Sequence, residues 1–240
     1  MNAGAPIDPL EYPFDVPADS FLWTSAGAEP LPTLISIDEL TADRQAVLAI
    51  GSNASVQQLS RKFNERRFAD PASQNGQIPV LRAEVDGFDV VYGAHLARYG
   101  SLPATLLDTP GACAQVLVTW LSFAQLERMN VSEGLGKAYQ LRQVTGVRSY
   151  GKPVVPAVSY VTAGGVALFG GSPLGLASIL APGSQWPRAT QVGAWDLLSL
   201  DMGCGSDGEA LSKRVLDSSD WRKKVEVHLG ANCLSEPPLP

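Results

Sequence analysis

A continuous apolar run that stops at a Gly-Ser-Asn tripeptide constrains the fold of this chain more than any other feature. Residues 46–50 (AVLAI) have the length and the uninterrupted hydrophobicity of a buried strand. Residues 51–53 break the run, and residues 54–67 then carry apolar side chains at helical spacing with basic side chains on the opposite face. The pattern therefore predicts a buried strand, a tight turn and a helix.

Strand-like segments cluster in the middle of the chain, whereas helix-like segments lie in the crossovers and near the two ends. The predicted strands are residues 79–92, folded into a hairpin at Asp86-Gly87, residues 104–107 and 114–121 on either side of a Pro110-Gly111 turn, and residues 139–145 and 154–161. The predicted helices after residue 67 are 123–129, with Ser122 as its cap, 194–200 and 208–228. This order is typical of an α+β fold rather than of regular β-α-β alternation.

The first 45 residues differ from the rest of the chain in charge and in proline content. They hold eight acidic residues and one basic residue, and six prolines lie between residues 6 and 32. Proline fixes φ and has no N–H group, so we expect an extended arm rather than regular structure. Five apolar anchors favour packing of this arm on the domain or on a neighbouring subunit: Tyr12, Phe14, Phe21, Leu22 and Trp23. We therefore divide the chain into an N-terminal arm (1–45), a central domain (46–200) and a C-terminal helix and tail (201–240).

Composition excludes several classes of function. Residues 46–240 carry 16 acidic and 17 basic residues, so they lack the basic field that a nucleic-acid-binding surface needs. No stretch of about 18 uncharged apolar residues exists, which argues against a membrane-spanning helix. The first residues show no secretory leader, and the cytoplasm is the expected compartment. Three cysteines without a C-x-x-C pair, together with two histidines, argue against a disulfide framework and against a zinc site. We expect neither a metal nor another cofactor.

Residues 51–53 have two compatible interpretations. Ser52 or Asn53 can cap the predicted helix while Gly51 allows the tight turn. The same geometry directs backbone N–H groups toward one point, where the helix dipole helps them to bind an anion such as a carboxylate. A second glycine motif, G-x-G-x-x-G at residues 203–208, follows a predicted helix instead of a strand, so we interpret it as a turn between helices rather than as a dinucleotide site.

Four further polar residues have structural interpretations when each is taken alone. Glu133, in the tripeptide Ser-Glu-Gly, is then a solvated surface acid, and Tyr139 is a half-buried residue at the start of a strand. His95 and Tyr99 share a loop-rich segment that offers no metal-binding partners.

These sequence segments support a second interpretation when they are considered together, in their order along the chain. Residues 49–53 resemble the aromatic-Gly-Ser-Asn signature that opens the gamma-glutamylcyclotransferase-like family. The other segments that resemble parts of this family are, in chain order, residues 88–93 (its second apolar strand), 103–106 (its Ala-Thr-Ile segment), 109–111 (its Ser-Pro-Gly segment), 116–120 (the following strand) and 123–134 (the helix that delivers its Glu-Gly). The resemblance covers residues 46–165, about half of the chain.

The resemblance implies a mixed β-barrel with flanking helices and an enzyme that releases 5-oxoproline from a γ-glutamyl amine or peptide. In that reaction the α-amine of the γ-glutamyl group attacks its own γ-carbonyl, so the protein has to fold its substrate and move protons. The implied site consists of Glu133 as the general acid–base group and of Ile50, Gly51, Ser52, Asn53 and Tyr139 as substrate contacts. The implied partner is a small γ-glutamyl molecule, and a homodimer is left open.

Two departures from the family keep other functions open. Ile50 stands where most members have tyrosine or phenylalanine, and residues 172–175 offer no counterpart of a later pocket tyrosine. These departures favour a protein that binds an amino-acid-like metabolite without turnover, whereas the retained Glu-Gly favours an enzyme. A third alternative is an interaction protein whose acidic, aromatic-bearing arm docks a partner.

Overall fold

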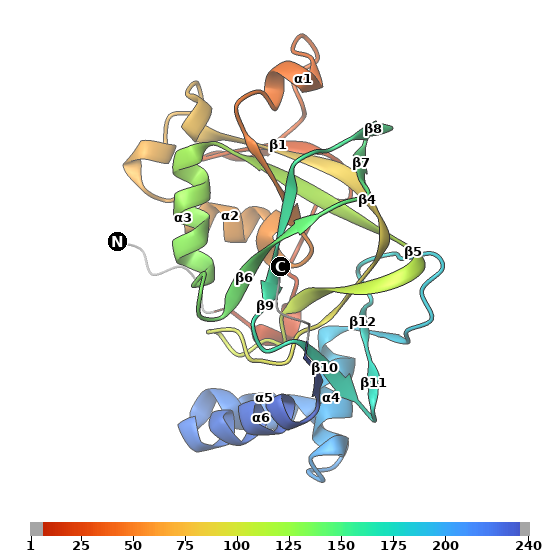
Figure 1. The fold of residues 1–240 in the computed structure, drawn as a ribbon. Helices are drawn as coiled ribbons and strands as arrows, with labels where there is room; N and C mark the ends of the chain where they lie inside the picture. The colour runs from red at the N-terminus through yellow and green to blue at the C-terminus, as the bar shows by residue number, and fades with distance from the viewer. Residues whose placement is uncertain (1–6, 236–240) are drawn as a thin grey trace.

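In the computed structural model, which describes residues 7–235, two long antiparallel strands run through the centre of the fold (Figure 1). They are β4 (Gln77–Tyr92) and β5 (Ala104–Leu121). Neither strand reverses where the sequence predicted a turn. Gly87 (φ +81°) on β4 and Gly111 (φ +86°) on β5 both lie where the register between the two strands shifts, between the pairs Asp86–Cys113 and Phe88–Asp108. Positive φ at this level bends both strands as a bulge, so the predicted hairpin and the predicted turn are both wrong.

Among residues 7–235, eleven strands, this pair included, form one mixed sheet, and three others form a small second sheet. The strands besides β4 and β5 are β1 (Phe21–Thr24), β2 (Gly27–Glu29), β3 (Gln45–Ala49), β6 (Tyr139–Val144), β7 (Val147–Ser149), β8 (Lys152–Pro153), β9 (Ala157–Thr162), β10 (Val166–Phe169), β11 (Ser172–Pro173), β12 (Gly175–Leu176), β13 (Arg188–Ala189) and β14 (Cys233–Leu234).

The strand order confirms the predicted α+β class without showing the predicted closed barrel. The main path of the large sheet is β13-β12-β4-β5-β3-β9-β6, and β11-β10-β14 is the small sheet. β1 and β7 also pair with β4, while β2 pairs with β1 and β8 with β7. The buried strand predicted from the apolar run is β3, which pairs antiparallel with β5 and parallel with β9. Within residues 7–235 the two ends of the path, β13 and β6, are not paired with each other. The large sheet therefore does not close into a barrel through hydrogen bonds between its two edge strands, β13 and β6.

Six α-helices occur in the described part of the chain. They are α1 (Ile37–Leu40), α2 (Val56–Lys62), α3 (Phe123–Glu133), α4 (Gln191–Asp201), α5 (Gly208–Asp217) and α6 (Ser219–Ala231), with short 3-10 turns at η1 (Pro9–Glu11), η2 (Ser52–Ala54), η3 (Arg66–Phe68) and η4 (Gln74–Gly76). None of the helices between residues 7 and 235 combines the length and the hydrophobicity needed to cross a bilayer.

All four predicted helices differ from their predicted bounds. α4, predicted at 194–200, spans Gln191–Asp201 because Thr190 caps it, so that it begins three residues before the predicted start. α2 starts two residues later than predicted because η2 occupies the residues directly after β3, and it stops at Lys62 because the backbone of Phe63 leaves the helical conformation. α3 begins at the predicted cap, Ser122, in a reciprocal capping box with Gln125, but it is longer than predicted and stops only at Gly134, which adopts the left-handed conformation. The predicted helix 208–228 is broken at Ser218, whose side chain caps α6. The glycine motif at 203–208 is the predicted turn between helices.

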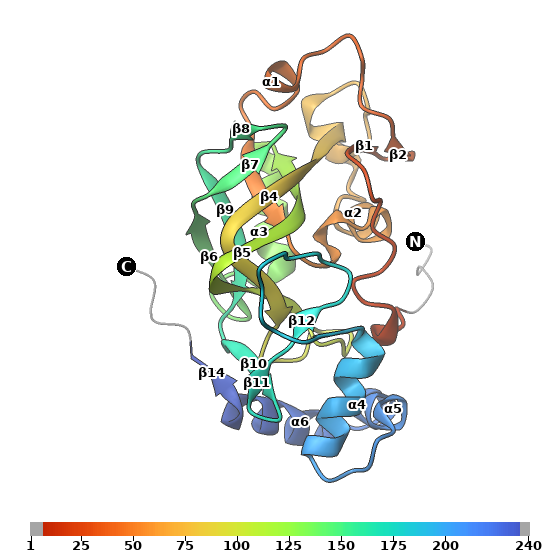
Figure 2. The ribbon, with the colours of Figure 1, turned by 90° about the vertical axis from the view of Figure 1, so that its right-hand side faces the viewer.

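The two faces of the sheet contact different hydrophobic clusters. Along β3, Leu48 packs into the larger cluster and Val47 into the smaller one, as period-2 alternation requires. α2 and α3 cover the smaller cluster, and their buried side chains include Leu59 and Met129. α4, α5 and α6 pack together at one end of the molecule, where Trp195 is fully buried in the larger cluster (Figures 1 and 2).

The N-terminal arm packs on its own chain. β1 extends the sheet by pairing with β4, in a register that places Phe21 opposite Val80. Phe21 and Trp23 are buried in the smaller cluster, and Tyr12 is buried in the larger one. Figure 2 shows the arm running along one side of the molecule from the region of α5 to β1. The arm therefore contributes to both cores.

Candidate active site

Glu133 is the last residue of α3, and its side chain is only 12% exposed, so it is not the solvated surface acid that its tripeptide predicts when taken alone. Its carboxylate forms an ion pair with the ammonium group of Lys62, the last residue of α2, which is 13% exposed. The same ammonium group contacts the side-chain oxygen of Asn53 and lies 3.5 Å from Met129 Sδ. One cation therefore joins α2, α3 and the turn that follows β3.

The C-terminal end of α3 is held against the sheet, and this fixes the position of Glu133. Met129 is fully buried in the smaller cluster one turn before Glu133. The hydroxyl of Tyr160, on β9, donates a 2.6 Å hydrogen bond to Asn130 Oδ1. Gly134 then ends the helix with φ +63°, a conformation that glycine adopts without a steric penalty. The Ser-Glu-Gly tripeptide thus makes Glu133 the final helical residue.

On its other side, the turn after β3 touches the N-terminal arm. The hydroxyl oxygen of Tyr12 accepts a 2.8 Å hydrogen bond from the backbone N–H of Ala104, at the start of β5. A Cβ atom at Gly51 would overlap this oxygen, so only glycine allows the phenol to lie here. The next residue of the turn, Ser52, lies close enough to Tyr99 to lower the pKa of its phenol, against the larger rise caused by burial.

The negative charge of Glu133 acts on the phenols of four tyrosines: Tyr12, Tyr99, Tyr139 and Tyr160. Burial is the largest cause that raises the pKa of each phenol, and the negative charge of Glu133 raises all four further. Each hydroxyl therefore keeps its proton at neutral pH and can donate a hydrogen bond.

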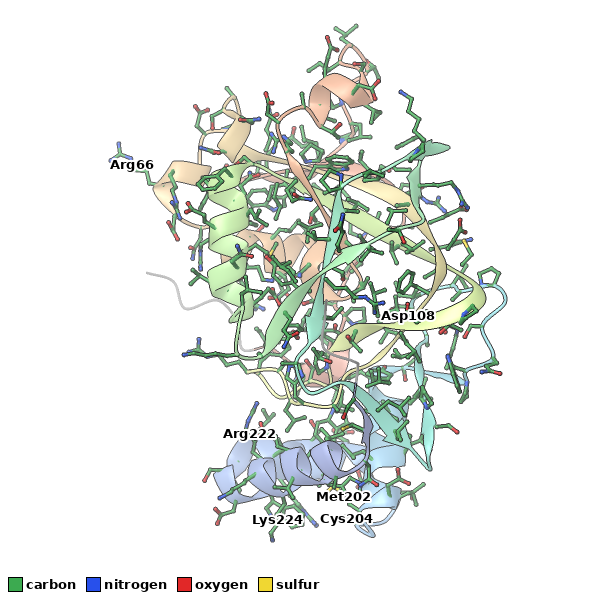
Figure 3. All side chains as sticks on the ribbon, in the orientation of Figure 1. Arg66, Asp108, Met202, Cys204, Arg222 and Lys224 are labelled. Carbon is green, nitrogen blue, oxygen red and sulfur yellow. The ribbon has the colours of Figure 1, made fainter. Side chains whose placement is uncertain are left out.

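His95 packs edge-on against Tyr139, with ring centroids 5.2 Å apart. Burial lowers the pKa of His95 to about 4, the charge of Arg222 lowers it further, and Glu133 opposes this shift. Arg222 lies on α6 and donates a 2.7 Å hydrogen bond to the carbonyl of Ala97, in the same loop as His95 (Figure 3). The imidazole is therefore neutral at pH 7.

This shift predicts a loss of stability in mild acid. Because the folded protein binds fewer protons at His95 than the unfolded chain does between pH 6.5 and 4, its stability is greatest above pH 6.5 and falls as the pH is lowered. At 1.36 kcal/mol per pKa unit, the loss attributable to His95 is about 3 kcal/mol. Urea unfolding of wild type and of His95→Phe across this range measures it. Parallel stability curves for the two proteins would contradict the assignment.

Removing Lys62 is expected to destabilise the protein by about 3 kcal/mol, since Lys62→Met leaves a largely buried carboxylate without its partner. The double variant Lys62→Met/Glu133→Leu removes both charges and should recover most of this loss. The control is Lys152→Met, which breaks an exposed pair with Asp38 and should cost about 0–1 kcal/mol. Urea unfolding compares the three variants. Equal losses in the single and double variants would show that the ion pair is not the cause.

A cavity of about 970 Å³ lies between the arm and one face of the sheet. Its lining comprises residues 13–20 of the arm, 49–51 at the end of β3, 82–84 of β4, 115–117 of β5, Arg148, 150–151 and 178–180. Arg82, Leu117 and Ala49 are register partners across three strands, so their side chains point to the same face. Among the described residues, Gly51 borders this cavity and Glu133 does not.

The structure brings most of the predicted site residues together. Asn53 and Glu133 meet at Lys62, and Tyr139 lies close enough to Glu133 for the carboxylate to raise the pKa of its phenol. Ser52 and Gly51 contact Tyr99 and Tyr12, respectively, within the same region. Ile50 is buried in the larger cluster, which also contains Tyr12, and it borders the cavity together with Gly51. The chemical roles of these residues stay predictions.

Sequence reasoning assigned no function to Lys62 or Tyr12. The basic residues of segment 54–67 were placed on a solvent-facing side, yet Lys62 follows Leu59 by three residues and so shares its buried face. That spacing is a signal that could have revealed Lys62. Tyr12 lies in the arm, far from every other site residue in the sequence, and no local pattern identifies it.

No protein-family model and no curated protein matches this sequence. The chain is similar to solved structures at low identity. A crystal structure of YkqA from Bacillus subtilis matches with 13% identity and a TM-score of 0.38, over 80% of this chain and 56% of that one. The uncharacterized protein loc79017 from Homo sapiens matches with 16% identity and a TM-score of 0.39, over 77% of this chain and 87% of that one. A gamma-glutamyl cyclotransferase matches with 14% identity and a TM-score of 0.40, over 77% of this chain and 99% of that one.

This chain thus spans little more than half the length of the YkqA chain. Likenesses of this extent concern the fold alone.

Proposed function

We propose that this protein is a γ-glutamyl cyclotransferase-type enzyme that releases 5-oxoproline from a γ-glutamyl amine or peptide, with Glu133 as general acid and base. One observation carries the proposal. The ammonium group of Lys62 contacts both the Glu133 carboxylate and the Asn53 side chain, so the acid and the turn named by the sequence resemblance lie within reach of one cation. The resemblance over residues 46–165 suggests the class of reaction.

The reaction requires three proton movements: one from the substrate ammonium group, one to the leaving nitrogen and one from the attacking nitrogen after it has bonded to carbon. At neutral pH the α-amine of the substrate is an ammonium group and cannot attack until a base removes its proton. Glu133, paired with Lys62, is in the carboxylate form that accepts this proton. The amine nitrogen then bonds to the γ-carbonyl carbon, and the protonated Glu133 returns its proton to the leaving nitrogen as the bond from the carbon to that nitrogen breaks. The attacking nitrogen, which still carries one hydrogen too many for the lactam, gives that proton to the regenerated Glu133 carboxylate, and from there it passes to the released amine, which leaves as an ammonium group. No water is consumed, and no covalent enzyme intermediate is needed.

The surrounding residues have binding roles in this proposal. The turn at residues 51–53 holds the α-carboxylate or the developing oxyanion with backbone N–H donors, and Tyr139 contacts the γ-glutamyl group. The cavity that begins at Gly51 is large enough for the substituent on the leaving nitrogen. Because the amine and the carbonyl belong to one molecule, correct folding of the substrate supplies much of the rate enhancement.

The direct test is release of 5-oxoproline from a panel of γ-glutamyl amines and γ-glutamyl dipeptides by the full chain, followed by chromatography. We expect at least one compound of the panel to yield 5-oxoproline and the free amine in equal amounts. Absence of release across the panel would contradict the proposal.

A second candidate is a ligand-binding protein without turnover. Two contacts favour it: the Tyr12 hydroxyl lies over Gly51, and the ammonium group of Lys62 neutralises the Glu133 carboxylate. Both would suit a site that holds a ligand without reacting with it. Titration calorimetry on the same panel separates the two functions. Saturable binding of intact γ-glutamyl compounds without product would favour the binding protein.

A further inference from the structure

We infer that Tyr12 of the N-terminal arm is a hydrogen-bond donor to an oxygen atom of the ligand that occupies the Gly51 turn. This inference deepens the proposed function, on which it rests for the identity of the ligand, a γ-glutamyl compound or the 5-oxoproline formed from it. It places one residue of the site in the N-terminal arm, outside residues 46–165, the region that resembles the known family.

The position of the phenol is fixed from two directions. Its oxygen accepts the 2.8 Å hydrogen bond from the Ala104 N–H, and it lies directly against Gly51, where a Cβ atom would overlap it. The ring packs edge-on against Phe14, at a centroid distance of 6.0 Å, and Phe14 in turn packs against Tyr99 at 5.6 Å. Tyr12 is 6% exposed. Its hydroxyl therefore has one well-defined location, at the junction of the turn and β5.

The hydrogen atom of the Tyr12 hydroxyl has no acceptor among the described residues. A phenol can accept and donate, and the bond from Ala104 uses its acceptor side. Burial, together with the charge of Glu133 and the neighbouring tyrosines, raises the pKa of Tyr12, so the proton is retained at neutral pH. A buried donor without an acceptor is costly unless a ligand or water supplies one.

The donor belongs to the same site as Glu133. The carboxylate raises the pKa of Tyr12 and of Tyr99 alike, and Ser52, the residue after Gly51, lies close enough to Tyr99 to oppose the rise in the pKa of its phenol. From residue 13 onward the arm forms a wall of the cavity that Gly51 borders. An oxygen atom of a γ-glutamyl group bound at the turn would thus lie beside the Tyr12 hydroxyl.

The arm is a fixed wall rather than a mobile lid. Before Tyr12, η1 contacts α4 and α5. After the cavity, the hydroxyl of Tyr150 donates a 2.9 Å hydrogen bond to Ser20 Oγ, and β1 enters the sheet with Trp23 buried. Withdrawing Tyr12 would require several of these contacts to break together. The phenol is therefore expected to stay in place when a ligand binds.

Tyr12→Phe tests the donor because it removes the hydroxyl and keeps the ring. Tyr92→Phe is the matched control, since Tyr92 is also buried and also has one hydrogen bond to a backbone group, the Ala189 carbonyl at 3.0 Å. For each protein, calorimetry gives the Kd for 5-oxoproline and steady-state kinetics give kcat/KM. We expect Tyr12→Phe to weaken binding and to lower kcat/KM about ten- to a hundred-fold, the range for a hydrogen bond to a charged oxygen. Tyr92→Phe should change neither more than about three-fold.

A second variant distinguishes a loss of the hydrogen bond to the ligand from a general change in folding. Gly51→Ala places a methyl group against the Tyr12 oxygen and should weaken ligand binding in wild type more than in the Tyr12→Phe background. Equal effects of Gly51→Ala in both backgrounds, or unchanged or tighter binding by Tyr12→Phe, would overturn the inference. Tyr12-dependent binding in a protein without turnover would uphold the donor while refuting the cyclotransferase. A wild-type protein that neither binds nor reacts would refute both.

Discussion

Replacing Glu133 by glutamine is expected to lower the turnover of the proposed cyclotransferase about 10²- to 10⁴-fold, the usual contribution of general acid–base catalysis. Glutamine has nearly the shape of glutamate, and its side-chain oxygen can still accept a hydrogen bond from Lys62. It cannot take the proton from the substrate ammonium group or return one to the leaving nitrogen. The loss should therefore appear mainly in kcat, with a much smaller change in KM. Initial rates of 5-oxoproline release at saturating substrate measure it.

The matched control is Glu127→Gln on the same helix. Glu127 is exposed and lies on α3 two turns before the catalytic candidate, so its variant should keep wild-type turnover. Circular dichroism and a thermal melt establish that both variants are folded. Wild-type turnover in folded Glu133→Gln would remove this residue from the mechanism, and an equal loss in both variants would indicate a general effect on α3.

Replacing Arg188 by methionine is expected to destabilise the fold by about 3–5 kcal/mol and to lower Tm by about 10 °C. Asp89, on β4, is completely buried, and its two carboxylate oxygens accept hydrogen bonds of 2.7 and 2.8 Å from the Arg188 guanidinium. Without Arg188, this carboxylate would be an unpaired charge in the core. Arg188 also donates to the carbonyls of Leu176 and Ile179, so the loop that lines the cavity should loosen as well.

Two further variants isolate the cause of this loss. Arg82→Met removes an arginine whose partner Asp19 is exposed, and it should cost at most about 1 kcal/mol. Adding Asp89→Asn to Arg188→Met removes the stranded charge and should recover a substantial part of the stability. Urea unfolding at pH 7 compares them. A loss below about 1 kcal/mol for Arg188→Met would show that Asp89 does not depend on its ion pair.

Local sequence patterns predicted the central elements of the fold well. The apolar run is β3, and its uninterrupted hydrophobicity follows from a position between β5 and β9 with a cluster on each face. Ser122 caps α3 as predicted because the capping box lies within four residues. The glycines of β4 and β5 were misassigned as turns because positive φ suits a bulge as well as a reversal. Only the pairing of the two strands distinguishes these outcomes.

The candidate site was predictable only where a short motif carried it. The Gly-Ser-Asn turn and Glu133 come from separate segments, and the family resemblance rather than any local rule linked them. Lys62 pairs with a residue 71 positions away, and the Tyr12 hydroxyl pairs with a backbone group 92 positions away. Contacts at such separations depend on the tertiary arrangement of the arm, α2 and α3. The hydrophobic periodicity of the sequence does not predict this arrangement.

The pairing of β1 with β4 has a consequence for the solubility of shortened forms of this chain. β1 covers residues 77–80 of β4, and β7 covers residues 84–85. A version that starts at residue 46 would leave the first of these stretches with unsatisfied backbone donors and acceptors along a strand rich in Ile, Val and Leu. Such an edge is a template for pairing with other molecules, so precipitation rather than monomeric folding is the expected fate of a chain without its arm.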